Sequence, residues 1–224
     1  MNSVKMNKFI LLFCFILILG NVIGQDIPPS LASRIKLIGM TYTPSEHYTV
    51  TPSENAFGEY ACSDVTCPLR RFQIVDSKFT NQDGQCKVYI FVSGAARILY
   101  EKFDKKSLDQ LSHPAPLSFN SIKHVFLYGQ RLRSATEQET KDLDMMLTHY
   151  PQENAKALFN ADYMVGFPYN MEGKKCEERF SSGRVLVTGK GGLDVFLYFF
   201  FTDQGADHFE KYLSDFKKIL WFND

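Results

Sequence analysis

Two stretches of alternating apolar and polar residues predict β-hairpins. Residues 72–74 and 86–91 show the two-residue period of strands, and turn-forming residues 81–84 separate them. A second hairpin is expected from residues 184–188 and 193–201 around a glycine-rich turn at 189–192. From Phe196 onward the last of these strands is apolar on both faces, which predicts a central strand covered on both sides. A further strand is expected over residues 163–167, ended by Pro168.

Helical periodicity is clearest in three later segments. Thr136 and Glu139 form a capping box and predict a helix that continues to residue 150. Its apolar face comprises Leu143, Met146, Leu147 and Tyr150. Pro151 is expected to open a short helix through residue 159, and the last helix is expected over residues 204–221, with Phe216 on its apolar stripe. Short helices are also expected near residues 31–37 and 104–111, and residues 114–132 are irregular apart from a strand near 124–128.

This order of elements predicts the fold class. Strands, helices, strands and a final helix, joined by hairpins instead of regular βαβ units, are typical of an α+β fold with a mainly antiparallel sheet and helices packed on it. Residues 25–60 contain several prolines and are expected to form an extended N-terminal arm. The arm carries too many apolar side chains to remain in water, so we expect it to pack on a single α+β domain of residues 61–224.

Residues 1–24 have the features of a signal peptide. Lys5 and Lys8 precede an apolar run at residues 9–19, and small or slender residues follow it up to Gly24. An apolar run of this length is too short to cross a bilayer of about 30 Å, which takes roughly 20 helical residues. We therefore expect cleavage after Gly24, no transmembrane segment afterwards, and a periplasmic or extracellular location. A retained N-terminal anchor is the alternative.

Composition and charge narrow the function classes. The chain of 224 residues has 25 basic and 25 acidic residues, and cleavage would remove Lys5 and Lys8, leaving two more acidic than basic residues. This balance excludes a strongly basic nucleic-acid binder, because such a protein needs a surface that neutralises phosphates. With 45% hydrophobic residues, the chain is also not intrinsically disordered.

Four cysteines remain after the expected cleavage, and an even number in an oxidising compartment predicts two disulfides. Four cysteines allow three pairings, of which we favour Cys62 with Cys67 and Cys86 with Cys176. A four-thiolate zinc site is the alternative. It is disfavoured because zinc sites usually contain two short cysteine pairs, whereas Cys86 and Cys176 each stand alone.

The sequence contains no recognisable catalytic motif. There is no Gly-x-Ser-x-Gly elbow, no His-Glu-x-x-His and no phosphate-binding loop, because the glycine-rich turn at 189–192 leads into a strand. The histidines lack metal-ligand spacing; they are His47, His113, His124, His149 and His208. We predict no cofactor, no metal and no catalytic residue, although a hydrolase with an unrecognised site stays open.

Two features point to a binding surface instead. Arg131 and Arg133 form a small basic cluster, and the chain has more aromatic residues than a small core requires. Tyr163 and Tyr169 are the aromatic candidates for such a surface.

Short C-terminal segments resemble small exported proteins of Gram-negative bacteria. These segments are residues 159–162, 200–205 and 221–224, and the junction between Gly24 and Gln25 is similar to their leaders. More distantly, the hairpin and closing helix over residues 184–221 resemble the tail of PsbP-like α+β sandwiches. The resemblance implies an exported α+β protein and carries over no catalytic residue.

Together these observations predict a non-catalytic exported module that binds an unknown protein or small-molecule ligand. The alternatives are an envelope hydrolase and an immunity or inhibitor protein directed against a toxin.

Overall fold

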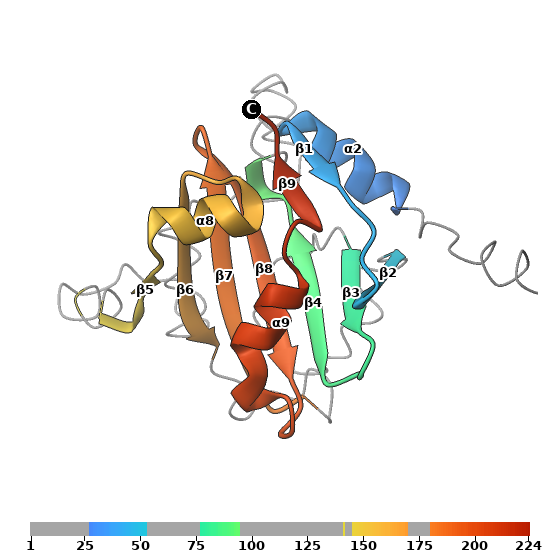
Figure 1. Ribbon diagram of the computed structural model, residues 1–224, viewed down its shortest axis with the longest axis vertical. Helices are drawn as coiled ribbons and strands as arrows, with labels where there is room; N and C mark the ends of the chain where they lie inside the picture. Colours follow the sequence, from blue (N-terminus) through green and yellow to red (C-terminus); the bar gives the residue numbers. More distant parts are fainter. Residues whose placement is uncertain (1–26, 53–76, 95–140, 142–144, 170–179) are drawn as a thin grey trace, which may run out of the picture.

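The computed structural model describes residues 27–52, 77–94, 141, 145–169 and 180–224. These residues form an α+β fold on one large antiparallel sheet, as the order of elements predicts (Figure 1). Within these ranges no helix has the length and apolar character needed to cross a lipid bilayer.

Seven antiparallel strands form the large sheet in the order β2-β3-β4-β8-β7-β6-β5. The strands are β2 (Tyr48–Pro52), β3 (Ser77–Asn81), β4 (Cys86–Phe91), β5 (Thr148–His149), β6 (Tyr163–Tyr169), β7 (Ser182–Lys190) and β8 (Leu193–Phe201). The hairpin predicted from residues 184–188 and 193–201 is confirmed as β7 with β8. A hairpin also forms around the predicted turn at 81–84, but the strand that pairs with β4 there is β3, which begins at Ser77, later in the chain than the expected residues 72–74. Gly191 and Gly192 have φ angles of 58° and 76°, and a tight hairpin turn needs such positive φ at both central residues.

Strand β8 occupies the centre of the sheet, between β4 and β7. Every residue from Val195 to Phe201 is buried, so the prediction of a central strand covered on both sides is confirmed. One of its faces, which includes Phe199, belongs to the main core.

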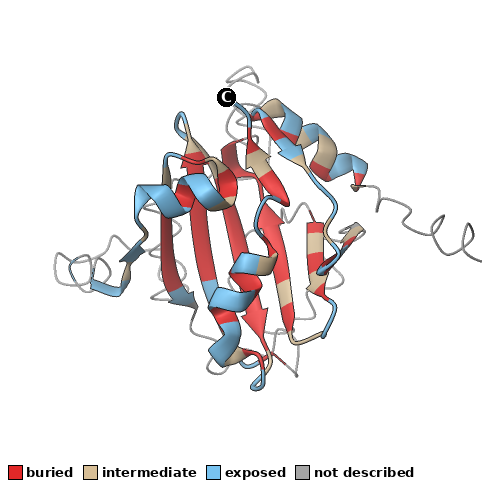
Figure 2. Ribbon diagram, viewed as in Figure 1, coloured by how far each residue is buried: buried red, intermediate tan, exposed pale blue. Residues whose placement is uncertain are grey.

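Three helices lie over this same face of the sheet (Figure 1), and the strands beneath them are buried (Figure 2). They are α2 (Pro29–Leu37), α8 (Gln152–Phe159) and α9 (Phe209–Asp215), the last preceded by the 3₁₀ turn η1 (Ala206–His208). The ring of Phe199 lies 5.4 Å from that of Phe209 and 6.0 Å from that of Phe216. Such edge-to-face pairs are a favourable arrangement of aromatic rings and hold α9 against β8.

The expected N-terminal arm is built into both sheets. It supplies α2, strand β1 (Met40–Tyr42) and strand β2, which is the edge strand of the large sheet. Strand β1 pairs with β9 (Leu220–Phe222) in a separate two-stranded sheet. Ile35, Ile38 and Met40 are buried in the main core. The apolar side chains of this segment therefore pack as expected.

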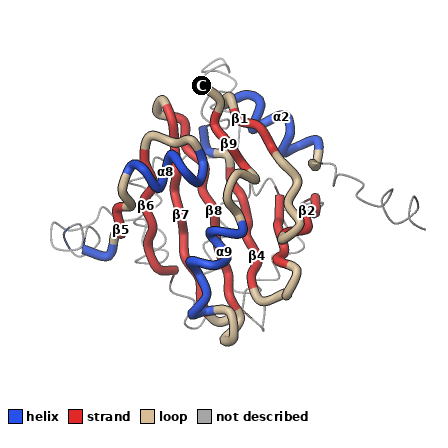
Figure 3. The backbone as a smooth tube through the Cα atoms, in the orientation of Figure 1, coloured by secondary structure: helices blue, strands red, loops and turns tan. Residues whose placement is uncertain are grey.

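Strand β9 replaces the end of the predicted last helix. Phe216 is buried as expected, but α9 ends at Asp215, and a loop joins it to β9 (Figure 3). The helix cannot continue because Lys218 has a left-handed φ of 64°. The strand that follows is held at its end by Asn160, whose Nδ2 donates to the Phe222 carbonyl at 2.7 Å.

Two other boundaries differ from expectation. In the described part of the expected helix at 136–150, helical structure ends at Met146, and Thr148 and His149 form β5. Met146 is 48% exposed rather than buried, because the chain leaves the helical course to pair with the edge of β6. Strand β6 also continues through Pro168, which is tolerated there because β5 pairs only with Val165 and Gly166.

Several expected elements lie outside the described residues. They are the hairpin residues 72–74, the helix at 104–111, the segment at 114–132 and the capping box at Thr136 and Glu139.

Candidate functional site

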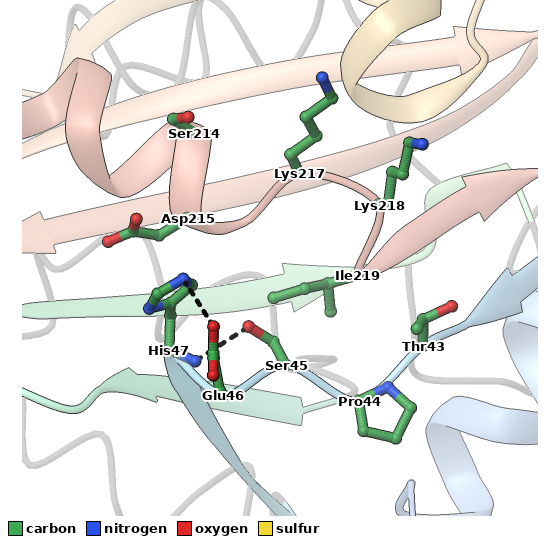
Figure 4. A pocket seen from close by; sticks show the side chains of 10 residues that line it. All are labelled: Thr43, Pro44, Ser45, Glu46, His47, Ser214, Asp215, Lys217, Lys218 and Ile219. Atoms are coloured by element: carbon green, nitrogen blue, oxygen red, sulfur yellow. Dashed lines mark hydrogen bonds and ion pairs between the residues drawn. The ribbon is translucent and has the colours of Figure 1, made fainter.

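An open groove of about 560 Å³ lies between two connecting segments (Figure 4). One wall is the β1–β2 connection, and the other runs from the end of α9 to the start of β9. We call it the polar groove; it is lined by Thr43, Pro44, Ser45, Glu46, His47, Ser214, Asp215, Lys217, Lys218 and Ile219. Only Pro44 and Ile219 among these are apolar, so the site suits a polar ligand.

Hydrogen bonds tie the two walls together at both ends of the groove. At one end the Thr43 amide donates to the Ile219 carbonyl at 2.9 Å. At the other end the buried Tyr48 hydroxyl donates to the Tyr212 carbonyl, also at 2.9 Å. The connecting segments separate between these two contacts. These two hydrogen bonds therefore fix the position of one wall relative to the other.

The β1–β2 wall is also held from the β3–β4 turn. Gln82 donates its backbone amide to the His47 carbonyl at 3.0 Å and its side-chain amide to the Glu46 carbonyl. Within the wall, the His47 amide donates to Ser45 Oγ at 3.1 Å. His47 Nε2 lies 3.7 Å from Glu46 Oε1, and both side chains are largely exposed. These contacts shape the loop and leave its polar side chains at the surface.

The α9–β9 wall carries an uneven distribution of charge. The Asp215 carboxylate lies 2.6 Å from the Lys211 ammonium, and this hydrogen bond raises the pKa of Lys211. Asp215 thus has a cationic partner one helical turn away. The Lys218 ammonium lies 5.7 Å from the centre of the Trp221 ring, and no described residue forms an ion pair with Lys217.

A second, much smaller cavity of about 100 Å³ lies over β6 and β7. Arg184 at its edge stacks over Phe209, with 4.7 Å from its guanidinium carbon to the ring centre. Tyr150 also lines it, and burial raises the pKa of this tyrosine. The cavity is too small for a drug-sized ligand, for which pockets of about 300–1,000 Å³ are usual.

Cys86 is a buried free thiol in the structure, so the expected bridge to Cys176 is not formed. Its Sγ lies 4.0 Å from the Tyr48 hydroxyl within the core beneath α9. Burial raises the pKa of the Cys86 thiol, which disfavours the reactive thiolate. The physical reason for the difference is the direction of strand β4, which places Cys86 among core side chains. Cys62, Cys67 and Cys176 lie outside the described residues, so their pairing stays a prediction.

The two candidate tyrosines belong to one strand. Tyr163 and Tyr169 lie at opposite ends of β6, where they pair with Gly189 and Gly183. Tyr163 is half-buried, and its hydroxyl donates to the Asp194 carboxylate. A Cβ at Gly189 would lie 2.8 Å from the Tyr163 ring, so this glycine makes room for the tyrosine. Tyr163 thus has a structural role.

Some of the remaining candidate residues lie outside the described residues. Arg131, Arg133, His113 and His124 lie outside them. His47, His149 and His208 are exposed, and the described residues contain no cluster of three metal-ligating side chains.

The polar groove has no signature in the sequence patterns described above. Its walls come from segments separated by about 170 residues, and each segment alone has the composition of an ordinary connection. The consecutive Lys217 and Lys218 are the one local signal for this wall. Basic residues at the end of an apolar helical stripe are typical of a helix terminus, so they indicate that α9 ends near this point.

Comparisons of the chain with protein-family models, with curated proteins and with solved structures found no match.

Proposed function

We propose that the protein is a non-catalytic, exported binding module that takes a ligand or a partner segment in the polar groove. The observation that carries the proposal is the pair of hydrogen bonds that ties the groove walls together at both ends. A preformed site loses less conformational freedom on binding than a free loop does. The groove volume of about 560 Å³ also falls within the usual range for ligand sites.

The described groups in and beneath the groove are suited to binding rather than catalysis. Cys86 is buried, and its raised pKa keeps it protonated at neutral pH. Asp215 is engaged by Lys211 at 2.6 Å. The groove therefore offers hydrogen-bonding and charged side chains, without an activated nucleophile among the described residues.

A hydrolase is the second candidate, because His47 and Glu46 lie close together on the rim of the groove. Their separation of 3.7 Å is longer than the roughly 2.6–3.2 Å expected of an acid–base pair poised for proton transfer. His47→Gln separates the two readings. A binding module should retain its ligand with this variant, whereas loss of ester or peptide hydrolysis, with ligand binding unchanged, would favour the enzyme.

Export is supported by the leader-like composition of residues 1–24, in which Lys5 and Lys8 precede an apolar run. Protein sequencing of the mature N-terminus tests this part of the proposal. A chain that begins at Gln25 in the extracytoplasmic fraction is the expected result, and a chain that keeps residue 1 and stays in the cytoplasmic fraction would contradict export.

The binding role is tested by affinity capture from envelope extract with the tagged mature chain and a groove-blocked variant. Ser214→Trp places a large ring on an exposed position of the groove wall. Lys156→Trp is the matched control, because it adds the same ring to an exposed position on α8. A partner retained by the wild type and the control but lost from Ser214→Trp supports the proposal. Equal capture by all three proteins would refute it.

A further inference from the structure

The charges along the polar groove are segregated. In Figure 4 the side chains of Lys217 and Lys218 extend together on the side away from Glu46 and His47. Asp215, the acidic residue on the same wall, is neutralised by Lys211 at 2.6 Å. The α9–β9 wall therefore has an excess of positive charge among the described residues.

The lysine pair is placed by the backbone turn that ends α9. Lys218 adopts a left-handed φ of 64°, and its amide donates to the Leu158 carbonyl at 3.1 Å. The turn is thus anchored to α8, and the two ammonium groups project from a fixed piece of chain. A backbone that is already fixed loses less freedom on binding than a mobile loop does.

The opposite wall adds hydroxyl and carbonyl groups. Thr43 and Ser45 line it, and its backbone is held by Gln82 and by Ile219. Such groups hydrogen-bond to peptide amides. His47 is the one aromatic ring among the lining residues, so the groove offers no pair of rings between which a sugar or base could stack. A volume of about 560 Å³ exceeds what a single small oxyanion occupies.

We infer that the polar groove binds an acidic peptide segment of a partner protein, with Lys217 and Lys218 contacting its carboxylates. This inference rests on the proposed function, since it names the class of ligand for the same site. An acidic segment places its carboxylates along the cationic wall, where opposite charges favour encounter and orientation. Its backbone lies against the hydroxyl-bearing β1–β2 wall.

The test uses three fluorescein-labelled hexapeptides that differ only at four positions, which are glutamate, glutamine or lysine. Binding to the mature chain is measured by fluorescence anisotropy. The charge variant is Lys217→Gln with Lys218→Asn, because asparagine tolerates the left-handed conformation of residue 218. The matched control is Lys36→Gln with Lys156→Gln, since these exposed lysines lie in the last turns of α2 and α8. Both double variants remove two positive charges near a helix end.

The expected result is that the glutamate peptide binds more tightly than the other two. The charge variant should weaken its binding by about tenfold, which corresponds to two exposed charge contacts of moderate strength. The control should bind as the wild type does. Binding of the glutamate peptide should also weaken as sodium chloride is raised, because salt screens exposed charges.

Three results would overturn the inference, and they separate it from the proposed function. If the glutamine peptide binds equally well and only Ser214→Trp abolishes binding, the groove binds ligands but has no acidic preference. If sodium sulfate displaces the peptide more strongly than sodium chloride at equal ionic strength, the lysines bind any oxyanion. If the glutamate peptide does not bind at all, the acidic assignment is wrong, and the capture experiment alone decides the proposed function.

Discussion

Replacing Phe216 with alanine should remove the side chain on which four aromatic rings converge. Phe216 is fully buried, and its ring lies 5.2 Å from that of Tyr48, 5.3 Å from Phe79, 6.0 Å from Phe199 and 6.5 Å from Phe159. These rings come from β2, β3, β8 and α8, so a single side chain joins α9 to most of the core.

The expected cost follows from this environment. Truncation of a buried phenylalanine costs about 3–5 kcal/mol, and each aromatic pair adds roughly 0.5–1.5 kcal/mol beyond burial, although these terms are not additive. We expect a loss at the upper end, about 4–5 kcal/mol. A typical domain is stable by only about 5–15 kcal/mol, so the variant should be marginally folded. Its thermal midpoint should fall by roughly 8–20 °C.

Guanidinium denaturation followed by tryptophan fluorescence measures this loss. Trp221 is the only tryptophan in the chain and lies half-buried in β9, next to the segment being tested. Lys217→Ala is the control, since residue 217 is exposed and its loss should change stability by no more than about 0.5 kcal/mol. If both variants unfold at the wild-type midpoint, α9 and β9 form a loosely attached tail and the reasoning is refuted.

Three further predictions concern glycine packing, the buried thiol and pH. Gly189→Ala should lower the free energy of unfolding by about 1–3 kcal/mol in the same assay, because the new Cβ would lie 2.8 Å from both Tyr163 and the Asp194 carboxylate. A midpoint equal to that of the wild type would contradict this. The Cys86 thiol should be inert to Ellman's reagent in the folded protein and react on unfolding, whereas rapid reaction of the native thiol would show that it is accessible. Stability should fall as pH rises above about 9 and further above 10, because Cys86 and Tyr48 ionise near 9.0 and 10.0 when unfolded but have raised pKa values when folded. Denaturation midpoints from pH 7 to 10.5 measure the decline, and Tyr48→Phe should reduce its slope above pH 10.

The local part of the fold could be predicted from the sequence. Alternation over residues 86–91 and the turn glycines Gly191 and Gly192 specify hairpins, because both signals act over a few neighbouring residues. The two-sided apolar pattern of β8 likewise gave its central position. Such elements depend little on what the rest of the chain does.

The errors arose where a distant partner decides the structure. The apolar period of the last helix continues to Trp221, yet residues 220–222 form β9 because β1 offers a strand to pair with. Thr148 and His149 leave their helical pattern for the same reason, since the edge of β6 is available to them. The apolar period of a segment shows only its local preference for helix or strand. It does not show whether a strand far away in sequence is available for pairing.

The polar groove escaped prediction because it belongs to no single segment. Ser45 and His47 are ordinary loop residues in sequence, as are Lys217 and Lys218. They line one groove because the fold brings the two segments together, where the Thr43 amide donates to the Ile219 carbonyl at 2.9 Å. That contact is a tertiary event with no local signature.

The pairing of β1 with β9 constrains the order in which the protein folds. Thr41 and Trp221, which face each other in this pair, are 180 residues apart, so the two strands cannot meet until nearly all the intervening chain has been synthesised. Residues so far apart in sequence can make contact only after the long chain between them has been closed into a loop. The entropy cost of closing this loop comes before the contact stabilises the fold, and this slows folding. A nascent chain that has emerged only as far as β8 would lack α9, β9 and Phe216, and would expose the apolar face they cover. It would therefore depend on protection from aggregation until its last residues emerge.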